Sequence, residues 1–180
     1  MILHTERLIL RPWHEEDAEQ LYKYAKDREV GYPAGWPAHT SVENSREIIK
    51  TVFSAPETYA VCKKDGSPIG SIGLKLNGYT DMTERDDECE LGYWIGKEFW
   101  GKGLIPEAAK ALLAYAFDTL GMRAVWCGYY DGNERSKRVQ EKLGFVYQHA
   151  TEGLEVSLLG EIRTGHLMLL TKERWQELAR

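Results

Sequence analysis

The spacing of apolar residues predicts two helices early in the chain. Apolar side chains recur at helical spacing between His14 and Lys26, and again after Ser41, which suits the N-cap position of a second helix. A first strand is predicted over residues 7–13, where the sequence reads RLILRPW. Residues 31–39 (GYPAGWPAH) are predicted to form no regular structure, because two prolines and two glycines interrupt any period.

Alternation of apolar and polar positions predicts strands in the middle of the chain. Residues 59–63 and 69–76 read as a hairpin, because Asp65-Gly66 between them is a strong hairpin-turn signal. An acidic run from Asp81 to Glu88 follows. A further strand is predicted over residues 90–95.

Helices and strands alternate in the remaining half. A helix is predicted from Gly103 to Leu120, with Pro106 in the first turn, where proline removes no intrahelical hydrogen bond. The elements predicted after it are a strand over 124–129, a helix from Asn133 to Leu143, one or two strands up to Leu170 and a terminal helix around Trp175. This order predicts one domain over residues 1–180 of the α+β or mixed α/β class, with at least one right-handed crossover.

Composition and charge narrow the class of protein. The chain has 180 residues, 43% hydrophobic and 28% charged, as expected for a single domain with a full core. No stretch approaches the ~20 apolar residues that cross a bilayer, and residues 1–11 lack a signal-peptide core, so we expect a cytoplasmic protein without a membrane partner. The net charge of −5 argues mildly against a nucleic-acid partner and is compatible with a cationic acceptor.

The cysteines and histidines offer no metal site. Cys62, Cys89 and Cys127 are widely spaced and each falls in a predicted strand, so we expect buried, reduced thiols. The five histidines are scattered, and no Cys/His cluster has the spacing of metal ligands. We therefore do not expect a metal enzyme.

The segment that follows the strand at residues 90–95 carries the most chemical information. Gly101-Lys102-Gly103 leads from a tight turn into a helix, where glycines let the backbone curve closely around an anion and the helix N-terminus offers unpaired N–H groups. Lys102 adds a positive charge. The residues suit a pyrophosphate cradle, and they equally suit a glycine-rich turn without a ligand.

This segment resembles the core motif of the GNAT acetyltransferases, Q/R-x-x-G-x-G/A. Residues 98–103 (EFWGKG) match both glycines but carry Glu98 where glutamine or arginine is usual. Asn133-Glu-Arg-Ser136 followed by residues 141–145 (EKLGF), and the opening residues 5–11 (TERLILR), resemble further signatures of the branch that holds ribosomal-protein N-terminal acetyltransferases. The three matches occur in the family's order.

The resemblance implies a GNAT fold, a mostly antiparallel sheet that splays at the cofactor-binding strand. It implies acetyl-CoA as co-substrate, held by the backbone of that strand, by the cradle and by the helix after residue 133. The residues implied are Trp94, Ile95, Gly96, Gly101, Lys102, Gly103, Leu104, Asn133 and Ser136. Asn133 could bind the cofactor, cap its helix, or do both.

Two residues are candidates for proton transfer. Glu90 matches a strand position where several GNAT branches carry a catalytic glutamate, so we expect it to deprotonate the amine directly or through water; the alternative is a solvated carboxylate at a strand edge. The tyrosine that many relatives use to protonate the leaving thiolate is replaced by Gln140 here. Ser136, the donor proposed for the ribosomal-protein branch, is the better candidate, although a serine on a helix surface would look the same.

The resemblance also points to an acceptor. The aromatic loop with Tyr32 and Trp36, and Tyr79 before the catalytic strand, lie where this family frames its acceptor; core packing would explain them equally well. We expect acetyl transfer to an amine, and the acceptor we expect above others is the α-amino group of a protein or peptide N-terminus. The alternatives are a small amine (antibiotic, polyamine or amino acid) and a non-catalytic acyl-CoA-binding module. A homodimer is compatible with the resemblance.

Overall fold

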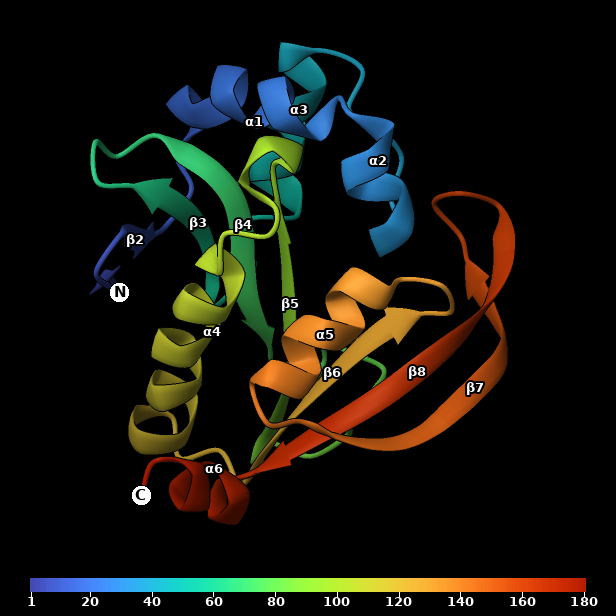
Figure 1. Ribbon diagram of the computed structural model, residues 1–180. Coiled ribbons are helices and arrows are strands. Elements are labelled where there is room, and N and C mark those ends of the chain that lie inside the picture. The colour runs from blue at the N-terminus through green and yellow to red at the C-terminus, as the bar shows by residue number, and fades with distance from the viewer.

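A computed structural model describes all residues from 1 to 180, and a single eight-stranded sheet runs through it (Figure 1). The strands lie side by side in the order β1-β2-β3-β4-β5-β6-β8-β7, and only β5 and β6 are parallel neighbours. The strands are β1 (Leu3–His4), β2 (Leu8–Arg11), β3 (Thr58–Lys63), β4 (Pro68–Lys75), β5 (Glu88–Ile95), β6 (Ala124–Tyr130), β7 (Val146–Val156) and β8 (Glu161–Thr171).

Six α-helices and shorter helical turns surround the sheet. The α-helices are α1 (Ala18–Ala25), α2 (Arg28–Gly31), α3 (Val42–Thr51), α4 (Leu104–Ala114), α5 (Glu134–Lys142) and α6 (Lys172–Leu178). The 3-10 turns are η1 (Glu15–Asp17), η2 (Tyr32–Ala34) and η3 (Lys97–Phe99), and α4 continues into a π-helical turn, η4 (Tyr115–Thr119). None of these helices is both long enough and apolar enough to cross a membrane.

Each face of the sheet buries its own apolar cluster, as the period of two along a strand requires. The larger cluster lies under α4 and η4 and includes Leu112 of α4, Phe117 of η4 and Leu91 of β5. The smaller cluster lies under α1 and α3 and includes Leu21 and Ile49. Figure 1 shows α4 and α5 on one side of the sheet.

The sheet opens between its two parallel strands. β5 and β6 pair only at their first residues, where Glu88, Cys89 and Glu90 lie opposite Ala124, Val125 and Trp126. Beyond Glu90 no residue of β5 lies in register with β6, and the Cys127 thiol donates a hydrogen bond to the Leu91 carbonyl at 3.2 Å. The ends of β5 and β6 therefore diverge, and the edge of β5 that faces the gap is left unpaired. This confirms the predicted fold class.

Most predicted elements are present, with two notable differences. Residues 31–39 are not wholly irregular: Asp27 accepts a hydrogen bond from the Glu29 N–H and starts α2, and Pro33 sits in the first turn of η2, where its missing N–H costs nothing. The predicted helix from Gly103 to Leu120 changes character at Tyr115, where the π-helical turn begins.

The predicted caps and buried thiols are confirmed. Ser41 caps α3 by accepting a hydrogen bond from the Asn44 N–H at 2.9 Å. All three cysteines are free and buried, and burial raises the pKa of Cys62 to about 11 and that of Cys89 to about 12. They remain protonated thiols in the folded protein near neutral pH.

Candidate active site

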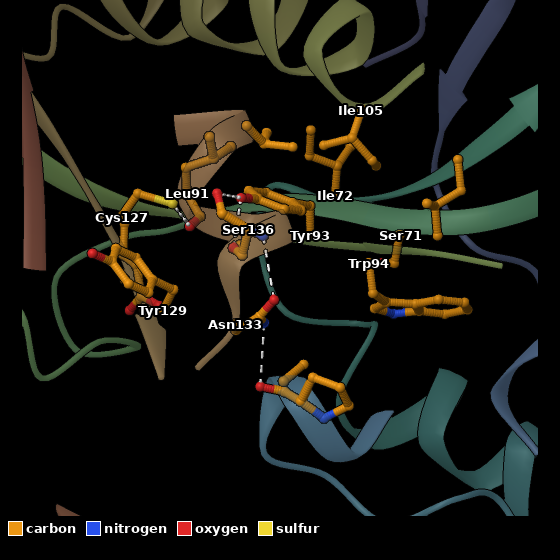
Figure 2. Close-up of a pocket in the computed structure, with 18 of the residues that line it drawn as sticks. Ser71, Ile72, Leu91, Tyr93, Trp94, Ile105, Cys127, Tyr129, Asn133 and Ser136 are labelled. Atoms are coloured by element: carbon orange, nitrogen blue, oxygen red, sulfur yellow. Dashed lines mark hydrogen bonds between the residues drawn. The ribbon is translucent and has the colours of Figure 1, made fainter. Parts of the chain in front are cut away.

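A cleft of about 1150 Å³ runs through the opening between β5 and β6. Its walls include the start of α4, the first turns of α5, and the loops that precede β5 and follow α2. The side chains of β5 alternate between its two sides, so that Tyr93 points toward α5 and Trp94 points away from it (Figure 2). The cleft therefore has two differently built halves, one on each side of β5.

The loop that enters α4 has a backbone geometry that suits an anion. Gly101 and Gly103 both have a φ of +73°, a conformation that only glycine adopts at little cost. No N–H group from Gly101 to Ile105 donates to a backbone carbonyl, and Gly103 is an N-cap without a side chain. These successive unpaired N–H groups, together with the positive end of the helix dipole, suit a phosphate or pyrophosphate.

The backbone of β5 supplies a second set of groups. The Gly96 N–H donates to the Ile69 carbonyl at 2.8 Å, so it faces β4 and not the opening, and Gly96 does not line the cleft. Along a strand the backbone groups of every second residue face the same edge. Those of Trp94, two residues before Gly96, therefore also face β4, where Trp94 pairs with Ser71. The expectation that Trp94 and Gly96 present backbone groups to a cofactor is therefore wrong for this geometry.

The backbone groups that face the opening belong to Tyr93 and Ile95. The Ile95 carbonyl already accepts a hydrogen bond from the Trp100 indole at 3.0 Å, so the Ile95 N–H is its unengaged backbone group. Tyr93 has both groups directed into the gap. An extended chain with amides of its own, such as the pantetheine arm of coenzyme A, could pair with this edge as an additional strand.

Arg135, and not the expected Lys102, brings a positive charge to the cleft. The Lys102 ammonium lies 5.7 Å from the centroid of the Phe99 ring, and Lys102 does not line the cleft. Arg135 does line it, stacked 3.3 Å from the centroid of the Trp100 ring, and it takes part in no salt bridge. Burial lowers the pKa of the Arg135 guanidinium, which nevertheless stays charged near neutral pH. Sequence reasoning missed this residue, because nothing in the chain signals its contact with a tryptophan 35 positions earlier.

A cluster of hydroxyl and amide groups faces the opening from the α5 side. The Tyr93 hydroxyl lies 2.8 Å from Ser136 Oγ, and Gln140 Nε2 donates to Ser136 Oγ at 3.1 Å and to the Gly128 carbonyl at 2.8 Å. Burial raises the pKa of Tyr93, which keeps its hydroxyl protonated. Tyr93 can therefore donate to Ser136 Oγ and leave the serine proton free for a group in the cleft.

Asn133 performs the capping role considered for it. Its side-chain oxygen accepts from the Ser136 N–H at 3.3 Å, and its amide donates to the Pro33 carbonyl at 3.4 Å (Figure 2). Both groups are thus engaged within the protein, and Asn133 joins the start of α5 to η2. Ser136 is held on the first turn of α5 by this cap.

Glu90 lies on the side of β5 opposite to Tyr93 and lines the cleft. Its carboxylate pairs with Lys75 at 3.0 Å and accepts a hydrogen bond from the Thr80 hydroxyl. Only 13% of the side chain is exposed, so Glu90 is not the solvated strand-edge carboxylate considered as the alternative. A carboxylate in this position is within the cleft and can accept a proton from a bound amine.

Two of the three residues expected to contact the acceptor line the cleft, and the third does not. Trp36 and Tyr79 line the cleft, and Trp36 meets Trp94 edge-on with 5.5 Å between ring centroids. Tyr32 does not line it: its hydroxyl donates to Glu161 at 2.8 Å and its ring carries the Arg163 guanidinium at 4.5 Å. Tyr32 instead fastens η2 to β8. No group of three or more histidine, cysteine or acidic side chains is arranged to hold a metal ion.

Known proteins share both the sequence pattern and the fold. Residues 7–146 match the family described as "Acetyltransferase (GNAT) domain". A Bacillus subtilis protein named "Putative ribosomal N-acetyltransferase YdaF" is 39% identical over 94 residues, which span 52% of this chain and about half (49%) of that relative. The ribosomal protein uS5-alanine N-acetyltransferase of Escherichia coli is 28% identical over 187 residues, covering 96% of this chain and 92% of that one.

Solved structures extend the similarity of fold. An acetyltransferase of the GNAT family from Bacillus anthracis superposes with a TM-score of 0.81 at 20% identity, over 96% of this chain and 99% of that one.

Proposed function

This chain belongs to the GNAT acetyltransferase family, and on that premise we propose that it moves an acetyl group from acetyl-CoA to the α-amino group of a protein or peptide. The observation that carries the proposal is the placement of two proton-handling groups on opposite sides of the opening in the sheet: Glu90 on one side of β5, and Ser136 with Tyr93 on the other. Direct transfer needs one group to take a proton from the amine and another to assist the leaving thiolate.

The α4 side of the cleft fits acetyl-CoA. The unpaired N–H groups from Gly101 to Ile105 would hold its pyrophosphate, and the Arg135 guanidinium is placed to contact a phosphate or the adenine. The free backbone edge at Tyr93 would pair with the pantetheine arm. When bound, acetyl-CoA supplies the activated acetyl thioester.

The protein's own residues supply the remaining chemistry. The Glu90 carboxylate takes the proton that the acceptor ammonium must lose, and Lys75 and Thr80 hold that carboxylate in place. The Tyr93 N–H, directed into the opening, is placed to stabilise negative charge on a carbonyl oxygen. Ser136 Oγ donates a hydrogen bond to the departing sulfur, while Tyr93 and Gln140 fix the serine oxygen.

An α-amino group suits this machinery better than a lysine. Its pKa near ~7.7–8.0 leaves a sizeable neutral fraction at pH 7, whereas a lysine near ~10.4 needs a far stronger base. The similarity to a ribosomal-protein alanine N-acetyltransferase over nearly the whole chain supports a protein N-terminus as the acceptor.

A thiol-release assay with acetyl-CoA tests the proposal. The acceptors would be short peptides that begin with alanine or serine, the same peptides with a blocked N-terminus and an internal lysine, spermidine, an aminoglycoside and free amino acids. We expect turnover with the free N-termini and none with the matched blocked peptides. Turnover confined to a small amine would overturn the acceptor assignment, and no binding of acetyl-CoA in calorimetry would overturn the whole proposal.

A further inference from the structure

The opening residues Thr5 to Arg7 have no role in the function proposed above, yet they converge on the cradle. Thr5 Oγ1 donates to Glu107 Oε1 at 2.6 Å, and the Arg7 N–H donates to the same oxygen at 2.8 Å. Arg7 Nε donates to Glu107 Oε2 at 2.6 Å. All three bonds span about a hundred residues of sequence and end on one carboxylate in the first turn of α4.

Arg7 also reaches the cradle backbone itself. Its Nη1 donates to the Lys102 carbonyl at 2.9 Å, between the two glycines of positive φ. The N–H and C=O of a trans peptide point in opposite directions. A Lys102 carbonyl turned toward Arg7 therefore turns the Gly103 N–H away from Arg7, so that it is free to join the unpaired N–H groups of Leu104 and Ile105.

The same contact deals with an unfavourable charge. Glu107 is a carboxylate in the first turn of the helix whose N-terminus would hold a pyrophosphate, so an isolated Glu107 would repel that ligand. Burial would raise the pKa of Glu107, but hydrogen bonds from Thr5 and Arg7 outweigh burial and lower the pKa, so that it stays ionised and paired. The guanidinium of Arg7 neutralises the charge of the Glu107 carboxylate by direct contact.

We propose that Arg7 is a positioning residue for the phosphates of the cofactor: it orients the Lys102–Gly103 peptide and neutralises Glu107 without itself lining the cleft. This assignment rests on the proposed use of acetyl-CoA. A lysine at position 7 could keep the ion pair with Glu107, but a single ammonium cannot reproduce the two separate contacts that the guanidinium fork makes, one to the Glu107 carboxylate and one to the Lys102 carbonyl.

The test separates the phosphate half of the cofactor from its arm. Isothermal calorimetry would measure the affinity of wild type, Arg7→Lys and Arg7→Met for three ligands. These are acetyl-CoA, 3′-phosphoadenosine 5′-diphosphate, which keeps every phosphate and lacks the arm, and pantetheine, which lacks every phosphate. Arg46→Met is the matched control, because Arg46 pairs with Glu43 on the surface of α3, away from the cleft. Melting temperatures would be recorded for all variants.

We expect Arg7→Lys to weaken binding of both phosphate-bearing probes by about tenfold, with pantetheine affinity unchanged and Arg46→Met like wild type. If Arg7→Met does not fold, the Arg7→Lys result decides. Affinity for 3′-phosphoadenosine 5′-diphosphate within twofold of wild type in folded Arg7→Lys would overturn the inference alone, as would an equal loss for pantetheine, which a general structural role would produce. Failure of wild type to bind any of the probes would overturn the proposed function and this inference with it.

Discussion

The two halves of the cleft differ in whether mainly backbone groups or side chains face the space for a ligand. On the α4 side the groups proposed to hold the cofactor are mainly backbone, namely the N–H groups from Gly101 to Ile105 and the free edge of β5 at Tyr93, with the side chains of Arg135 and Ser136 beside them. On the opposite side they are side chains contributed by separate segments, among them Glu90, Trp36 and Tyr79. A backbone site depends on conformation, which a few glycines can fix, whereas a side-chain site changes with every substitution.

This difference bears on how one fold can serve different acceptors. The fold and the glycine cradle can be common to a family whose acceptors differ, since neither depends on the acceptor-side residues. The groups proposed to handle protons, Glu90 on one side and Ser136 with Tyr93 on the other, lie on either side of β5, the strand that separates the two halves. Predictions that affect one half and spare the other test whether the division holds.

The largest effect should come from the acceptor side. Glu90→Gln keeps the size of the side chain and removes the base, so kcat should fall about 100-fold while the Kd for acetyl-CoA stays within twofold. Steady-state kinetics and calorimetry measure the two quantities, with Glu84→Gln in the exposed acidic loop as the control. Retention of full kcat by Glu90→Gln would remove Glu90 from the mechanism.

The next effect belongs to the cofactor side and should show the reverse pattern. Gly101→Ala forces a Cβ onto a φ of +73°, which costs ~1–2 kcal/mol, so the loop should relax and the Kd for acetyl-CoA should rise about tenfold. There is open space around Gly101, so the effect comes from conformation and not from a clash. Gly121→Ala carries the same strain at a φ of +72° away from the cradle and should leave the Kd unchanged.

The α5 side should respond in kcat, less strongly than Glu90. Ser136→Ala removes a hydrogen bond to the departing sulfur, worth about 1 kcal/mol, so kcat should fall several-fold, close to tenfold at most. Tyr93→Phe removes only the support of Ser136 and should cost about threefold. A larger loss for Tyr93→Phe than for Ser136→Ala would make Tyr93 the donor.

The smallest effect concerns the stability of the cofactor side. The pKa of Glu107 is lowered in the folded state, so its contribution to stability is present above its unfolded pKa, near ~4.3, and is lost as the pH falls through the lower folded value. Glu107→Gln should therefore cost about 1 kcal/mol at pH 7 and progressively less below pH 4. Thermal melting from pH 7 to pH 3 measures this. An unchanged difference between the two proteins across that range would contradict the role given to the ionised carboxylate.

The sequence predicts best those features that local rules control. Ser41 and Asn133 are helix caps at their expected places, and the Asp65-Gly66 turn joins the expected hairpin. Gly101 and Gly103 have the positive φ that a tight loop entering a helix requires. The prediction of no regular structure holds for residues 35–39 and is wrong for residues 31–34, where Gly31 ends α2 and Pro33 takes a tolerated position in η2.

Contacts between distant residues were beyond reach of the sequence. Tyr93 and Ser136 are 43 residues apart, and their hydrogen bond depends on how α5 docks across the opening. The Arg7–Glu107 pair and the stacking of Arg135 on Trp100 arise in the same way. The orientation of backbone groups along β5 is also set by pairing with β4. The free backbone groups therefore belong to Tyr93 and Ile95, and not to Trp94 and Gly96 as expected.

The central claim is that the cofactor binds through backbone N–H groups on one side of β5. Amide hydrogen exchange, followed residue by residue by NMR with and without saturating coenzyme A, tests it without an acceptor. The account predicts strong protection from Gly101 to Ile105 and at Tyr93, with little change at Trp36 and Tyr79. Saturated binding that leaves the amides from Gly101 to Ile105 unprotected would contradict it.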